Sequence, residues 1–190
     1  MNRLQAVIII ITAALTMPAI TSCGKSGVEA AREGGLTDAQ ILSVDDKEFL
    51  KAAERSLILQ KTGADIAMTK STNADIQDFA RQVAAERSQD LAKLNALVKL
   101  KDSSQPPATE EELQLEVTHR LHGLTGGALD HEFISLMTAE QQQCLRIFDR
   151  AQASADPDIR KFATEVLPRL RKDFDTVAGL ETKLGVPNTR

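Results

Sequence analysis

Residues 156–184, DPDIRKFATEVLPRLRKDFDTVAGLETKL, decide the fold, because they form the pattern of one long amphipathic helix. Asp156 followed by Pro157 is a typical helix start, and Gly185 and Pro187 are typical stop signals. Only Asp173, near mid-length, interrupts its apolar stripe. The stripe recurs at steps of three and four residues: Ile159, Phe162, Val166, Leu170, Val177, Leu180 and Leu184.

Three further segments repeat this design, at about residues 46–71, 73–100 and 128–154. We expect Asp45 or Asp46 to cap the first of them and Asn73 to cap the second. Each stripe again contains one polar residue near mid-length, namely Gln60, Arg87 and Gln141 in turn. The first two segments are one or two residues apart, which predicts an antiparallel hairpin. Residues 101–127 contain a loop and a short helix to about His122, so the connection to the third segment is long. We therefore predict an all-α, ferritin-like antiparallel four-helix bundle over residues 46–184. A short extra helix would lie in the crossover between helices two and three.

The N-terminal 22 residues have the features of a signal peptide. Arg3 precedes an apolar run over residues 6–15, which is too short for a permanent membrane helix. The stretch Ile20-Thr21-Ser22-Cys23 resembles a bacterial lipobox, which predicts lipid attachment at Cys23; an ordinary signal peptide cut nearby is the alternative. Residues 23–45 would then form the acylated tether. Gly24 follows the cysteine in place of an Asp, which favours the outer membrane facing the periplasm.

The composition does not support nucleic acid as a partner. The chain has 23 basic and 27 acidic residues, a formal charge of −4, and no Trp or Tyr. The charges are interspersed, so nothing indicates nucleic-acid binding. Once Cys23 is acylated only Cys144 remains, and we expect it to be a small core residue. The expected partners are the membrane, through the N-terminal lipid, and a protein that the sequence does not identify.

Three sequence segments resemble the bacterial domain of unknown function 4142 family. They are Ile76-Gln77-Asp78-Phe79-Ala80, Asp130-His131-Glu132-Phe133, and Phe162-Ala163-Thr164-Glu165-Val166-Leu167-Pro168-Arg169-Leu170. The resemblance covers about residues 45–180 and is most specific in the last segment. It implies a ferritin-like fold in an exported or lipid-anchored envelope protein. The family has little settled biochemistry.

The resemblance also implies a ligand set that this chain lacks. Typical members carry a Glu, an Asp-His pair, a His and a second His on the four helices. Motif matching places these at Gln60, Glu86-Arg87, Gln141 beside Glu140, and Asp173. Amides are poor metal ligands and Arg cannot ligate, so the resemblance implies a degenerate metal centre. Glu86 and Glu140 are possible flanking carboxylates.

Three interpretations of the polar set stay open. The first is a buried cluster in which Arg87 pairs with Asp173 and the two amides satisfy the remaining groups. The second is a metal-binding or redox stress-protection protein, and the third is a misphased stripe that faces solvent. His119, His122 and His131 could also hold a metal, although a solvated face is their usual fate. We expect a non-catalytic binding or structural module with no cofactor.

Overall fold

The computed structural model of the chain describes residues 42–101 and 110–186. These residues contain five helices and no strand, so the all-α prediction is confirmed. The helices are α2 (Val44–Lys70), α3 (Ala74–Leu100), α4 (Glu110–Leu121), α5 (Gly126–Ala151) and α6 (Pro157–Leu184). No helix in the described ranges is long and apolar enough to cross a membrane.

Side-chain caps fix where the helices begin. Asn73 accepts a hydrogen bond from the backbone of Asp75 at the start of α3, and Asp156 accepts from two backbone amides at the start of α6. Both residues are the caps that the sequence predicts. The cap of α2 was predicted wrongly: Ser43, not Asp45 or Asp46, accepts the backbone N–H of Asp46 at 3.0 Å. Helix α2 therefore starts two residues earlier than expected.

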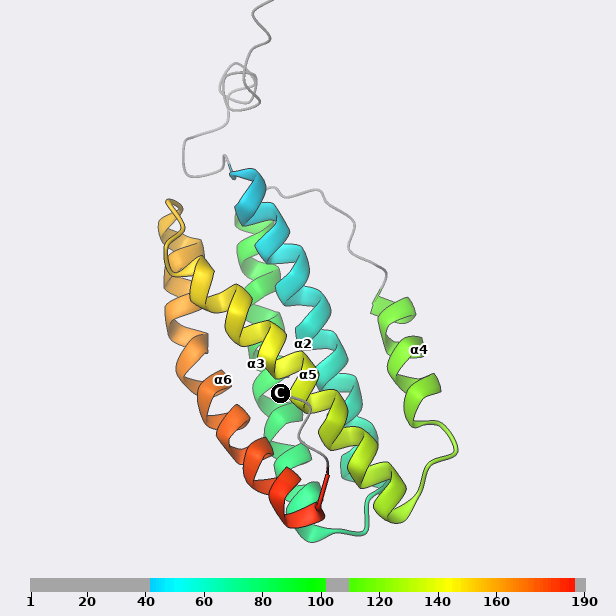
Figure 1. Cartoon of the computed structure of the whole chain (residues 1–190). Coiled ribbons are helices and arrows are strands. Elements are labelled where there is room, and N and C mark those ends of the chain that lie inside the picture. The colour runs from blue at the N-terminus through cyan, green and yellow to red at the C-terminus, as the bar shows by residue number, and fades with distance from the viewer. Residues whose placement is uncertain (1–41, 102–109, 187–190) are drawn as a thin grey trace, which may run out of the picture.

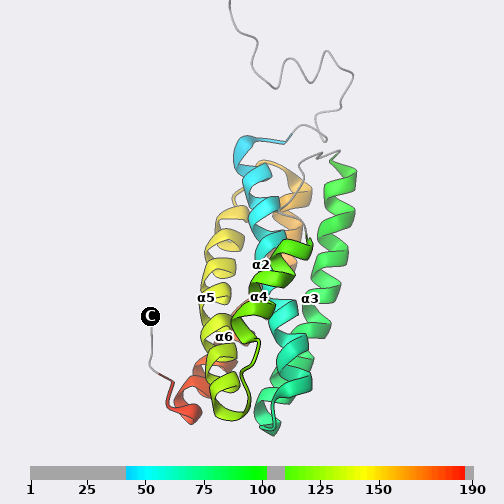
Figure 2. The same cartoon turned by 90° about the vertical axis from the view of Figure 1, so that its right-hand side faces the viewer.

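The four long helices pack as a bundle, with α2 against α3 and α5, and α6 against α5 and α3. Neighbours in this arrangement run antiparallel (Figure 1). Helix α4 lies outside the bundle and packs mainly against α2. It runs along the side of the bundle, between the end of α3 and the start of α5 in the chain (Figure 2). Its buried residues Leu113, Val117 and Leu121 are four apart and cover an apolar patch that includes Leu59 and Leu136.

The bundle core consists of two apolar clusters. One contains Leu57, Leu94, Cys144 and Leu170, from α2, α3, α5 and α6 respectively. The other contains, in the same order of helices, Ala64, Val83, Met137 and Val177. Between these members, α3 contains one fully buried polar residue that the sequence did not single out, Asp90. On each of the four long helices, the polar residue singled out in the sequence is fully buried and lies between the two members. We call this set the polar layer: Gln60, Arg87, Gln141 and Asp173.

Candidate functional site

Arg87 is at the centre of the polar layer and its side chain has no exposed surface. Its Nε donates to Oε1 of Gln60 on α2 at 2.8 Å, and its Nη2 donates to Oδ2 of Asp173 on α6 at 2.5 Å. Its Nη1 donates a longer bond of 3.5 Å to Asp90, one turn further along α3. One guanidinium on α3 therefore connects three helices.

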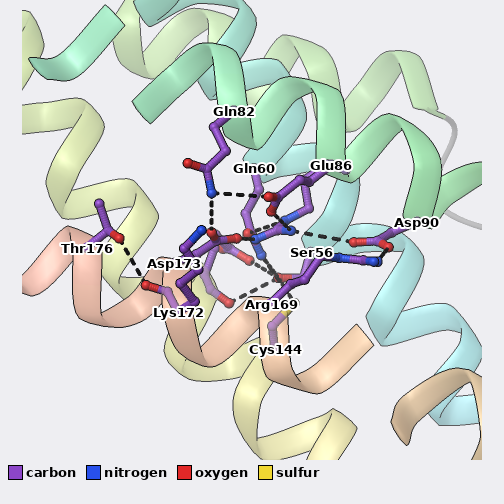
Figure 3. Close-up of polar contacts among 12 residues, drawn as sticks. Ser56, Gln60, Gln82, Glu86, Asp90, Cys144, Arg169, Lys172, Asp173 and Thr176 are labelled. Carbon is purple, nitrogen blue, oxygen red and sulfur yellow. Dashed lines mark hydrogen bonds and ion pairs between the residues drawn. The ribbon is translucent and has the colours of Figure 1, made fainter. Parts of the chain in front are cut away.

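Two further groups join the ionic part of the site (Figure 3). Arg169 on α6 pairs with the second carboxylate oxygen of Asp90. Glu86 has an oxygen 3.7 Å from Nη1 of Arg87, and Gln82 donates to both Glu86 and Asp173, at 3.1 and 3.3 Å. With all groups ionised, three carboxylates (Glu86, Asp90 and Asp173) face two guanidiniums. The cluster then carries one excess negative charge.

Burial, together with this excess charge, raises the pKa values of the carboxyl groups in the cluster. Burial raises the pKa of Asp173 to about 6. The Arg87 charge opposes the rise, whereas the Glu86 carboxylate adds to it. Burial likewise raises the pKa of Asp90, although Arg169 and Arg87 lower it. A low-dielectric site penalises the charged form of an acid. Asp173 and Asp90 therefore bind a proton at a higher pH than an exposed aspartate does.

A second arm of hydrogen bonds leads from Gln60 toward α5. The Gln60 amide donates to Ser56 at 3.3 Å and to the Cys144 sulfur at 3.2 Å. Ser56 in turn donates to the Glu140 carboxylate at 2.8 Å, and burial raises the pKa of Glu140. Glu140 thus contacts the layer through Ser56, and side chains from all four long helices form one continuous network.

Gln141 is the member of the layer that the network leaves out. Its side chain is fully buried, and neither its oxygen nor its nitrogen has a hydrogen-bond partner. It was expected to satisfy groups around the Arg87–Asp173 pair, and in the described residues it does not. Besides Asp173, the residues that accept hydrogen bonds from Arg87 are Gln60, as expected, and Asp90.

The residues present do not fit a metal ion. Arg87 places a positive guanidinium at the level where the four helices meet, and a guanidinium cannot ligate. No three His, Cys, Asp or Glu side chains within the described ranges are arranged to hold a metal. His119, His122 and His131 are all exposed. Cys23, the predicted lipid attachment site, lies outside the described residues.

Three participants were not singled out by the sequence. Asp90 follows Arg87 by three residues, so helical spacing could have placed it on the same face. Gln82 and Arg169 lie beside the apolar stripes, and only their long side chains reach inward. Asp90 was missed because Leu91 appeared to continue the stripe, whereas Asp90 is fully buried and Leu91 only partly.

A family model described as a domain of unknown function (DUF4142) matches residues 31–180. No curated protein and no solved structure matches the chain. The match spans most of the sequence, including all of α2, α3 and α5, helix α6 as far as residue 180, and every residue of the polar layer. The chain therefore belongs to the DUF4142 family, whose function is unknown.

Proposed function

We propose that the protein is a non-catalytic binding or structural module of the cell envelope. A lipid on Cys23 anchors it, most simply in the outer membrane facing the periplasm. In the bundle, a salt-bridged polar network takes the place of a metal centre. The observation that carries this proposal is the fully buried Arg87, which donates to both Gln60 and Asp173 in the layer.

The chemistry of the layer favours a structural role. Removing one partner from a buried, hydrogen-bonded ion pair is costly, whereas the intact pair adds little net stability. Such a network favours one alignment of the helices over others, because a shifted helix would leave charges unpaired. Cys144 adds no reactive nucleophile, because burial raises its pKa and only the thiolate attacks.

The competing function is metal binding or redox protection of the ferritin-like type. A cation in the layer would lie close to the Arg87 guanidinium, which repels it. Asp173 would have to exchange its 2.5 Å bond with Arg87 for the metal. Both effects lower metal affinity, so the geometry favours the structural proposal.

Metal analysis of the purified protein distinguishes the two functions. After dialysis we expect less than stoichiometric iron, zinc and copper. The Arg87→His, Gln141→His variant serves as the control that restores two imidazole ligands and removes the repelling charge. Stoichiometric metal in the unmodified protein would overturn the proposal.

Anchoring and partner need separate measurements. Cys23→Ser should abolish incorporation of labelled palmitate and move the protein from the membrane to the soluble fraction, whereas Cys144→Ser should change neither. Unchanged membrane association in Cys23→Ser would contradict the anchor. Crosslinking with mass spectrometry in intact cells would then identify a partner.

A further inference from the structure

The Gln141 amide is the starting point, because it is a buried polar group without a partner. It lies on α5 between Met137 and Cys144, which belong to the two different apolar clusters. Its side chain has no exposed surface, and both its oxygen and its nitrogen lack hydrogen bonds. Native proteins satisfy nearly all such groups, with protein atoms or with ordered water.

Other hydrogen-bonding capacity remains in the same layer. A guanidinium has five N–H donors, and Arg87 uses three of them, toward Gln60, Asp173 and Asp90. The inner oxygen of Glu86 is also buried without a hydrogen bond, since its 3.7 Å separation from Nη1 of Arg87 is too long for one. The layer therefore has unused donors on Arg87 and Gln141, and unused acceptors remain on Gln141 and on the adjoining Glu86.

We infer that the polar layer binds an internal water molecule through the Gln141 amide. The ligand must both donate and accept hydrogen bonds and must be small enough for a packed core, and water has these properties. Buried waters commonly make about three hydrogen bonds to polar groups that would otherwise be unsatisfied. The water would be the partner that the protein does not provide for Gln141.

Nuclear magnetic resonance on the nitrogen-15-labelled full chain tests this site. We expect cross-peaks between the Gln141 side-chain NH2 group and a long-lived water. The internal control is Gln60, whose amide donates to Ser56 and Cys144 and should show no such cross-peak. A Gln141 amide that is as free of water cross-peaks as Gln60 would overturn the inference.

A substitution gives a second, independent result. Gln141→Met keeps the size of the side chain but cannot hold the water, so we expect a lower urea midpoint than in the unmodified protein. Met137→Leu, one turn earlier on the same face, controls for repacking of this part of the core. If no water bound the amide, Gln141→Met would remove a buried carbonyl and a buried NH2 group that both lack partners, and the urea midpoint would rise. A higher midpoint in Gln141→Met, with Met137→Leu unchanged, would contradict the bound water.

Discussion

Arg87 on α3 and Asp173 on α6 form a 2.5 Å ion pair in which neither side chain has any exposed surface. In the sequence of each helix, the paired residue lies between members of the two apolar clusters of the bundle core. Ions so enclosed must be paired, because desolvation of a lone charge costs several kcal/mol.

The pH dependence of stability should reveal the Asp173 carboxyl. Its pKa rises from 3.8 in the unfolded chain to about 6 in the folded protein. The folded state therefore binds more protons between these values, so this group makes the free energy of unfolding fall as the pH rises from about 4 to about 6. Urea unfolding at a series of pH values should show this slope, and Asp173→Asn should reduce it. An equal slope in both proteins would assign the titration to another group.

Removal of Arg87 should have an effect that depends on pH. Arg87→Met leaves Asp173 without its main partner and should lower the free energy of unfolding by about 3–5 kcal/mol near neutral pH. Below about pH 5 the loss should be smaller, because a protonated Asp173 no longer needs a counter-charge. Denaturant titrations at the two pH values measure the difference. A loss that does not change with pH would show that Asp173 is not the group left unpaired.

Lys101 should stabilise the junction of α3 and α6. Its buried ammonium contacts Asp156 and Asp158, each at 2.7 Å, and these hydrogen bonds raise its pKa although burial lowers it. Asp156 keeps its backbone bonds without the lysine, so Lys101→Met should cost about 2 kcal/mol. Lys99→Met, at an exposed position, should cost almost nothing. Equal thermal unfolding of the two variants would contradict this role.

Two glycines inside helices should respond oppositely to alanine. A Cβ on Gly179 meets nothing within 4 Å, so Gly179→Ala should stabilise α6 by about 1 kcal/mol. A Cβ on Gly63 would lie 2.7 Å from Leu136 Cδ2, which is buried between α2 and α5. The helix-propensity gain is then offset by repacking, and Gly63→Ala should be neutral or destabilising. Stabilisation of both variants by the same amount would mean that α2 and α5 pack less closely here.

Much of the fold could be predicted because the apolar spacing is regular. Steps of three and four residues placed the buried faces of the long helices, and Asn73, Asp156 and Gly185 are recognisable end signals. The start of α2 was missed because Ser43, Asp45 and Asp46 are all good caps. Which of the three becomes the cap depends on tertiary contacts, including the 2.5 Å hydrogen bond from Ser154 to Asp46.

The site could be predicted only in part. Spacing singled out Arg87 and Asp173, but after Arg87 both Asp90 and Leu91 fit the helical period, and the sequence offers no choice between them. The role of Arg169 depends on a long side chain that reaches inward from a partly exposed position. The missing partner of Gln141 depends on distances between helices, which residue spacing does not fix.

A double-mutant cycle on Arg87 and Asp173 tests most directly the buried ion pair on which the proposed structural role of the polar layer rests. The cycle compares Arg87→Met, Asp173→Leu and the double variant by urea unfolding near pH 7. We predict that the double variant recovers most of the stability lost in Arg87→Met, because neither charge is then left alone and Arg169 still pairs with Asp90. A double variant no more stable than Arg87→Met alone would contradict the pairing.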